Sequence, residues 1–304
     1  MDRAVIVIAG PTASGKTTLG IQLAQQTDGE IISADSRQIY RHMDIGTAKP
    51  NPTERSEVPH HLIDIVDPDT PYSADTFAHD ASGLIEDIAG RGHQPIVVGG
   101  AGFYLEALFD GLSPVPSTPD EIRKEVGERM QSDPKGAYRE LQRIDPKAAA
   151  SLTGSDRQRI SRALEVHAST GYPISHFQAQ PRVPATLRKA VRFGLSWDRG
   201  RLYDRIKQRV ITMVEEGLVE ETRSLFERGY DRETYALKTF GYREIGAHIE
   251  GAITLEDAIV EIQVRTRHYA KRQLTWFRNR SSLKWLGADA PDNVDVILTS
   301  ATNA

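Results

Sequence analysis

The chain has 304 residues, a formal net charge of −4 and no cysteine. This length predicts one large domain or two smaller ones, and the lack of cysteine excludes disulfides and thiolate metal sites. The acidic balance excludes a globally basic nucleic-acid binder, so any RNA-binding surface must be local. We see no leader peptide and no apolar run of membrane-spanning length, and therefore expect a cytoplasmic protein without membrane contact.

A phosphate-binding motif of the form G-x-x-x-x-G-K-[ST] lies near the amino terminus. An apolar run at 4–8 predicts a strand before it, and Leu19 and Leu23 predict a helix after it. Backbone amides of such a loop surround phosphate oxygens, the lysine adds a charge, and the Thr17 hydroxyl can bind Mg²⁺. The motif leaves ATP, GTP and another diphosphate open. The diphosphate-binding candidates are Gly10, Pro11, Thr12, Ala13, Ser14, Gly15, Lys16 and Thr17.

A second predicted strand, 30–34, ends at Asp35. The carboxyl ends of parallel strands surround the ligand crevice of α/β sheets, so we expect Asp35 beside the phosphate loop. Three roles remain open for its carboxylate: a Mg²⁺ ligand, a helix N-cap or an acid–base group.

The next segments are also typical of an α/β protein. We predict a short strand at 60–65, a helix at 77–88 and a buried strand at 95–98. His60 and His61 point to opposite faces of a strand, which favours one packed and one solvated histidine over a shared metal. At the glycine turn 99–102, close approach to a ligand and tight packing remain equally open.

Residues 113–188 differ from the flanking sequence in composition, because prolines cluster at both ends and no strand-like run lies between them. We predict an all-helical insertion there, within a core formed by 1–112 and 189–304. Its clearest helix is expected to begin with a capping box, in which Ser155 is the cap and Gln158 follows three residues later. Arg159 and Arg162 lie on neighbouring turns of one edge of that helix.

Beyond the insertion, alternation at 191–197 predicts a strand that returns to the sheet. The following helix carries Arg201, Arg205, Lys207 and Arg209, for which a solvated basic face is the default interpretation. Residues 262–288 contain no acidic residue and place Arg267, Lys271 and Arg278 on one helical stripe. Tyr269, Trp276 and Phe277 interleave with these charges. Such a stripe suits RNA, although core packing is the preferred interpretation for Trp276 and Phe277.

Together these blocks resemble the bacterial tRNA dimethylallyltransferases, a family of isopentenyl transferases. The resemblance runs from about residue 5 to about residue 280. Its motifs are GPTASGKT (10–17), ADSRQIYR (34–41), DIGTAKP (44–50), VPHHLIDI (58–65), RQRISRALEV (157–166), LKTFGYREI (237–245) and TRHYAKRQLTWFR (266–278).

The resemblance implies a P-loop NTPase-like parallel sheet with an inserted helical domain that grips the anticodon stem–loop. It implies transfer of a dimethylallyl group from dimethylallyl diphosphate to N6 of an adenine in tRNA, with Mg²⁺, by a monomer. It also implies that Arg209 binds the diphosphate. The tRNA-binding candidates that it implies are Asp35, Ser36, Arg37, Gln38, Ala101, Arg123, Gln158, Arg159, Ile160, Ser161, Arg162, Lys238, Thr239, Phe240, Gly241, Tyr242, Arg243, Arg267, Lys271 and Arg278.

In this chemistry, Lys16, Mg²⁺ and the loop amides stabilise the leaving diphosphate, and Asp35 becomes the candidate general base for the N6 proton. Ala101 departs from the family, which usually has threonine there, near the reacting centre. Two other functions remain open: a small-molecule kinase that uses ATP, and a non-catalytic, nucleotide-gated RNA-binding protein. A GTPase is disfavoured because the sequence has no N-K-x-D motif.

Overall fold

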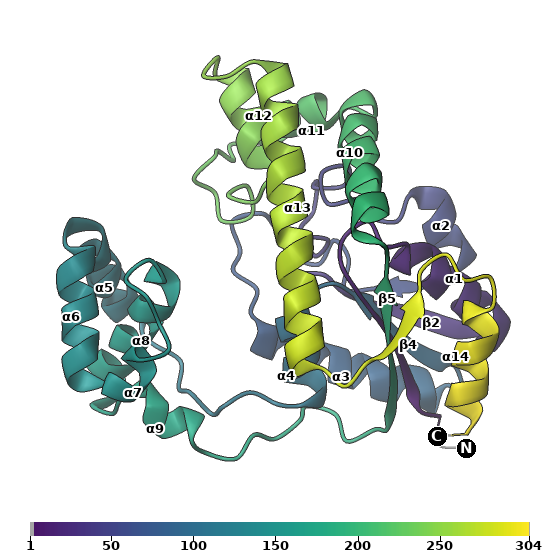
Figure 1. Cartoon of the computed structure of the whole chain (residues 1–304), viewed down its shortest axis with the longest axis horizontal. Helices are drawn as coiled ribbons and strands as arrows, with labels where there is room; N and C mark the ends of the chain where they lie inside the picture. Colours follow the sequence, from purple (N-terminus) through teal and green to yellow (C-terminus); the bar gives the residue numbers. More distant parts are fainter. Residues whose placement is uncertain (1–2, 304) are drawn as a thin grey trace. The chain divides into compact units, whose positions relative to one another are not determined.

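The computed structural model describes residues 3–303 and divides into two compact units (Figure 1). The first unit comprises the chain up to Phe109 and from Ala185 onward, and the second comprises Asp110–Pro184. The second unit begins three residues earlier and ends four residues earlier than the predicted insertion at 113–188.

A six-stranded parallel sheet forms the centre of the first unit, and its order is β3-β2-β4-β1-β5-β6. The strands are β1 (Val5–Ala9), β2 (Gly29–Ala34), β3 (His60–His61), β4 (Gln94–Gly99), β5 (Ala190–Ser196) and β6 (Lys284–Gly287). Gly99 is in register with both Ala9 and Ala34, so three strands end at one level. The phosphate loop, Asp35 and the 99–102 turn therefore all leave the sheet at the same edge.

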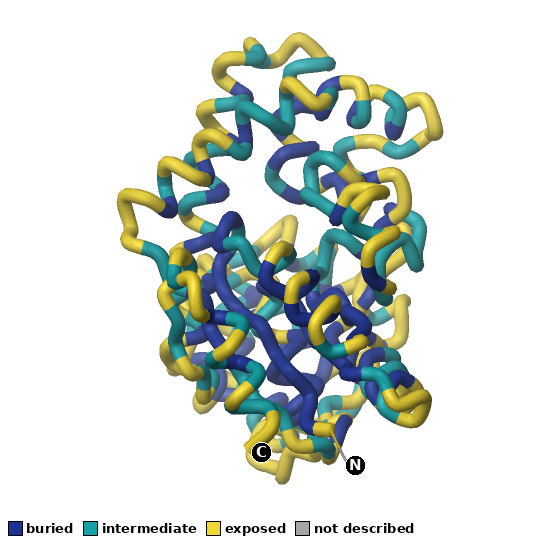
Figure 2. Tube along the Cα trace, turned by 90° about the vertical axis from the view of Figure 1, so that its right-hand side faces the viewer, coloured by how far each residue is buried: buried dark blue, intermediate teal, exposed yellow. Residues whose placement is uncertain are grey.

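Helices cover this sheet, and its central strands are buried along their whole length (Figure 2). The helices of the first unit are α1 (Lys16–Thr27), α2 (Pro52–Glu57), α3 (Ala74–Gly90), α4 (Gly102–Phe109), α10 (Arg199–Glu215), α11 (Leu218–Glu227), α12 (Tyr242–Ile249), α13 (Leu255–Arg280) and α14 (Asn293–Thr302). The predicted α/β class with a parallel, P-loop-type sheet is confirmed. No helix within residues 3–303 is long and apolar enough to cross a membrane.

Side chains at both ends of the long helix α13 stabilise its first and last turns. The Thr254 side chain accepts a hydrogen bond from the amide of Asp257, which caps the first turn. Acidic residues occupy that turn, and Arg278 and Arg280 occupy the last turn, as the helix dipole favours. Figure 1 shows α13 running from the neighbourhood of α12 to that of α4. It can therefore contribute to several parts of one site.

The second unit is entirely helical in its named elements. These are α5 (Asp120–Ser132), α6 (Pro134–Ile144), α7 (Pro146–Ala149), α8 (Arg157–Thr170) and α9 (Ile174–Gln178). Its core gathers apolar side chains from α5, α6 and α8, including Val126, Leu141, Ile160 and Leu164. Ile160 is fully buried there, so its side chain supports the fold and is not free to bind RNA as predicted.

Three local predictions are wrong. Ser155 does not cap α8: the N-cap is Asp156, whose carboxylate instead accepts from the Thr153 amide and hydroxyl, while Ser155 bonds Thr153. The strand predicted at 60–65 ends after His61, because Leu62 and Asp64 adopt left-handed backbone angles. Both histidines are partly buried and hydrogen-bonded, rather than one packed and one solvated.

Candidate active site

Two side chains that the sequence analysis did not assign to the phosphate loop, Trp197 and Arg205, donate hydrogen bonds to its backbone. The indole of Trp197 donates to the Ser14 carbonyl at 3.1 Å, and Arg205 donates to the Ala13 carbonyl at 2.9 Å. The predicted solvated basic face of α10 is therefore only partly solvated. Because α1 begins at Lys16, the amides of its first turn lack intrahelical partners and are available to an anion.

Gln273 ties the phosphate loop to the neighbouring glycine turn. Its side-chain oxygen accepts from the Thr12 amide at 2.9 Å, and its nitrogen donates to the Gly100 carbonyl at 2.8 Å. A Cβ on Gly100 would lie 2.3 Å from that nitrogen, so close packing requires glycine there. The packing alternative for this turn therefore holds at Gly100, which also lines the cavity described below.

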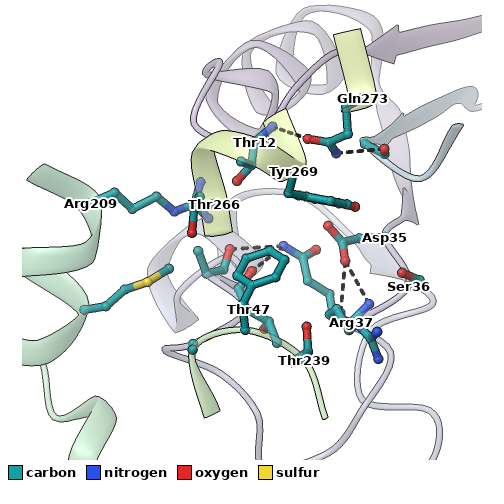
Figure 3. A pocket seen from close by; sticks show the side chains of 18 of the residues that line it. Thr12, Asp35, Ser36, Arg37, Thr47, Arg209, Thr239, Thr266, Tyr269 and Gln273 are labelled. Carbon is teal, nitrogen blue, oxygen red and sulfur yellow. Dashed lines mark hydrogen bonds between the residues drawn. The ribbon is translucent and has the colours of Figure 1, made fainter. Parts of the chain in front are cut away.

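Asp35 emerges from the end of β2 and faces the same space. One carboxylate oxygen accepts from the Arg37 amide at 2.8 Å and the Gln38 amide at 3.4 Å, which fixes the turn that follows the strand. Figure 3 shows the other oxygen directed toward Tyr269, with Arg209 entering the pocket from the opposite side. Residues 36–39 form a turn and not a helix, so the helix N-cap role considered for Asp35 is wrong: one oxygen holds this turn, and the second is directed at the pocket.

Two cavities meet at the phosphate loop. The first has a volume of about 450 Å³ and brings together residues from β2, the 46–50 loop, α10, the 238–244 segment and α13. The second has a volume of about 1100 Å³ and lies between the phosphate loop, α2 and α10. Residues that line both are Lys16, Thr17, Ala48, Pro50, Arg209 and Met213. The shared residues include the lysine and threonine that the motif assigns to a diphosphate.

The electrostatics of this junction favour an anion. Burial, and then the charge of Arg209, lower the pKa of Lys16 to about 7, while Asp35 opposes the shift. Burial also lowers the pKa of Arg209, again against the effect of Asp35. Burial therefore disfavours the charged forms of Lys16 and Arg209, and the Asp35 carboxylate opposes this effect. The negative charge of an incoming diphosphate would stabilise both cations.

The structure gathers the predicted site residues of the 35–38 and 238–243 segments, with part of the phosphate loop and Arg209, around the first cavity. Its lining includes Thr12, Lys16, Thr17, Asp35, Ser36, Arg37, Gln38, Arg209, Lys238, Thr239, Phe240, Gly241 and Arg243. Tyr242 is fully buried, so its side chain is not available to RNA as predicted. Ala101 lines neither cavity; its amide donates to the Ala34 carbonyl at 3.1 Å, next to Asp35.

The predicted basic stripe of α13 lines neither cavity, and its Lys271 and Arg278 are exposed. Arg267 stacks over Tyr203 of α10, and Arg278 stacks over Trp285 of β6. On the cavity side, α13 instead presents Tyr269 and Arg272. Phe277 is fully buried and Trp276 is partly buried, so the core interpretation is confirmed for Phe277 and holds in part for Trp276.

Comparison with known families agrees with this arrangement. The IPP transferase model matches residues 38–280, and the isopentenyl transferase model matches residues 3–63. The chain belongs to the IPP transferase family. It is 45% identical over 298 residues to the tRNA dimethylallyltransferase of Geobacter sulfurreducens, covering 98% of this chain and 95% of that protein. It is 46% identical over 283 residues to tRNA dimethylallyltransferase 2 of Geotalea uraniireducens, covering 93% and 91%.

Solved structures of the family share the fold. The tRNA isopentenylpyrophosphate transferase of Bacillus halodurans superimposes with a TM-score of 0.71 at 38% identity, covering 99% of this chain and 95% of that chain. A eukaryotic dimethylallyltransferase, studied crystallographically while acting on tRNA, superimposes with a TM-score of 0.80 at 30% identity, covering 99% and 78%. These relatives are named as transferases, which does not favour the kinase alternative.

Proposed function

We propose that this chain transfers a dimethylallyl group from dimethylallyl diphosphate to N6 of an adenine in the anticodon loop of tRNA, releasing diphosphate. The observation that carries the proposal is that a carboxylate, Asp35, faces the same cavity as the phosphate-loop Lys16 and Arg209. Membership of the IPP transferase family supports it.

The reaction requires positively charged groups around the leaving diphosphate. The bond from the allylic carbon to the diphosphate oxygen breaks as the bond from N6 to that carbon forms. Negative charge grows on the diphosphate, where the first-turn amides of α1, Lys16 and Arg209 can stabilise it more strongly than in the ground state. The N6 proton goes to the second oxygen of Asp35, which acts as general base.

Mg²⁺ fits the site as a partner of the diphosphate. Within residues 3–303, no group of three or more His, Asp or Glu side chains is placed to hold a metal. Mg²⁺ commonly keeps waters and binds one or two protein oxygens together with substrate phosphates, and Thr17 lines both cavities. We therefore propose Thr17 as its protein ligand. When bound, the ion neutralises charge on the leaving diphosphate.

The target base must leave its stack to reach this cavity, at a cost of a few kcal/mol that is smaller in a loop than in a duplex. The proposed tRNA contacts around the cavity are Ser36, Arg37, Gln38 and the cavity-lining part of 238–243. In the second unit, the exposed side chains of Gln158 and Arg159 at the start of α8 are proposed to contact the stem–loop.

The decisive test incubates the protein and unmodified tRNA with Mg²⁺ and either dimethylallyl diphosphate labelled in its carbon chain or ATP labelled in its terminal phosphate. We expect label to reach tRNA only from the first donor, and to be lost with Asp35→Asn or a chelator. Absence of transfer from dimethylallyl diphosphate, or transfer of the ATP label to a small acceptor, would overturn the proposal.

A further inference from the structure

One carboxylate on α11 joins two walls of the first cavity. The side chain of Glu221 accepts hydrogen bonds from the backbone amides of Asp44, Ile45 and Gly46 at 2.9, 2.8 and 3.1 Å. It also accepts from the hydroxyl of Tyr242 at 2.6 Å. Three successive amides around one carboxylate form an anion-binding nest, here filled from within the chain.

The contact is closely packed around the tyrosine. Tyr242 is fully buried, and a Cβ on Gly46 would lie 2.6 Å from its ring, so only glycine allows the loop to lie against it. Burial and the neighbouring Glu221 raise the pKa of Tyr242, which keeps its hydroxyl protonated as a donor. The arrangement is therefore a fixed joint between the 44–46 backbone and the first residue of α12.

Both sides of this joint continue into the cavity wall. On one side, Thr47 and Ala48 follow the nest, line the cavity and accept from the Gln38 side chain at 3.4 and 3.0 Å. Gln38 in turn belongs to the turn that Asp35 fixes. On the other side, the segment 238–241 lines the cavity and leads directly into Tyr242.

We propose that Glu221 is a positioning residue for the acceptor base: it sets the separation between the 46–48 wall and the 238–241 wall, between which the adenine must lie to meet Asp35. This inference rests on the proposed function. Glu221 is not among the residues that line either cavity, so its effect passes through the two walls and not through contact with substrate.

The chemistry of the nest makes the glutamine variant informative. A glutamine has one acceptor oxygen and would direct its NH₂ group at backbone or hydroxyl donors, so Glu221→Gln cannot reproduce the four bonds. Glu221→Asp keeps the carboxylate on a shorter stem. Tyr242→Phe removes a single donor and keeps the ring. Glu220 is an exposed glutamate on the same turn, and Glu220→Gln is the matched control for lost charge.

The experiment measures steady-state transfer by each variant, varying tRNA and dimethylallyl diphosphate separately, with thermal unfolding alongside. For Glu221→Gln we expect kcat/KM for tRNA to fall by roughly 10–100-fold, with a raised KM for tRNA, while KM for dimethylallyl diphosphate stays within about threefold. Tyr242→Phe should have a smaller effect of the same kind, Glu221→Asp should recover part of the loss, and Glu220→Gln should behave as wild type.

A purely structural role would lower the amount of active enzyme. The apparent kcat would then fall whichever substrate is varied, and KM for tRNA would not rise. That pattern, or a Glu221→Gln enzyme equal to wild type, would overturn the positioning role. If Glu221→Gln does not fold, an unchanged KM for tRNA in Tyr242→Phe overturns it instead. Failure of the wild-type protein to transfer the dimethylallyl group would overturn the proposed function itself, so the two failures are distinguishable.

Discussion

The ammonium of Lys16 donates to the carbonyl oxygen of Pro11, in its own phosphate loop, at 2.7 Å. The lysine is thus folded back on the loop that should present it to a diphosphate, in surroundings that lower its pKa to about 7. Because the pKa of Lys16 is lowered, binding of a diphosphate above pH 7 should draw in a proton, since the anion raises the lysine pKa again.

Affinity for dimethylallyl diphosphate should therefore weaken as pH rises above 7, by at most about tenfold per pH unit for one proton. The measurement is the dissociation constant at pH 6.5, 7.5 and 8.5. Lys16→Ala should bind more weakly and lose this part of the pH dependence. The same slope in the variant would show that Lys16 is not the group that titrates.

Asp35→Asn should separate catalysis from structure. The asparagine oxygen can still accept from the Arg37 amide, which holds the turn, while the base is lost. We expect single-turnover transfer to fall by roughly 10²–10⁴-fold with tRNA binding within a few-fold of wild type. Asp35→Ala should lose the turn as well. Near wild-type transfer by Asp35→Asn would remove this carboxylate from the mechanism.

The two arginines of α8 should behave differently. Arg159 is exposed, whereas Arg162 donates to the Thr118 hydroxyl at 2.5 Å and the Pro116 carbonyl at 2.8 Å. Arg159→Ala should raise KM for tRNA and reduce the slope of log affinity against log salt by about one phosphate contact. Arg162→Ala should mainly lower the melting temperature. An unchanged salt slope in Arg159→Ala would show that this side chain makes no phosphate contact and is simply solvated.

Ala101→Thr tests the departure from the family. Ala101 directly precedes α4, and its carbonyl accepts from the Leu105 amide, so a threonine hydroxyl there can cap the helix, adding about 1 kcal/mol to stability. We also expect kcat to rise by roughly 10–10³-fold, as when one active-site donor is restored. A threonine variant that is more stable but no faster would assign position 101 to the helix alone.

The ion pair between the buried Glu30 and the exposed Arg91 should affect stability in acid at the opposite end of the strands. Hydrogen bonds from Arg91 lower the pKa of Glu30 to about 2 from an ordinary value of 4.5, with a smaller contribution from His61 and with burial opposing the shift. A lowered carboxyl pKa stabilises the folded state above 4.5, and that stabilisation is lost as pH falls from 4.5 toward 2.

Arg91→Ala should therefore lower the free energy of unfolding at pH 7 and lower it less at pH 3. Urea unfolding at the two pH values measures this. The control is Asp87→Ala, which removes the exposed partner of Arg91 and should change stability by less than about 0.5 kcal/mol. An equal loss at both pH values would contradict the role of the Glu30 charge.

The sequence predicts the sheet and the phosphate loop well because their signals are local: an apolar run, a glycine loop and helical spacing. It also predicts that Asp35 meets the loop, since parallel strands end at one edge. Glu221 and Gln273 carry no such signal. The backbone amides that Glu221 binds lie 175 to 177 residues away, and the two partners of Gln273 lie 173 and 261 residues away. Periodicity likewise places Arg267 and Arg278 on one stripe of α13, but it does not identify Tyr203 and Trp285, the rings over which they lie.

The hydrogen bond between Thr12 and Gln273 also determines when the phosphate loop can be completed during synthesis of the chain. The phosphate loop is among the first segments to be synthesised, yet the side chain that accepts from its amide comes 261 residues later. A nascent chain that ends before α13 has the motif but not this tie, nor the link from the loop to Gly100. The phosphate loop therefore reaches its final form only when almost the whole protein has been made, so truncated products carry the signature of a phosphate binder without its finished geometry.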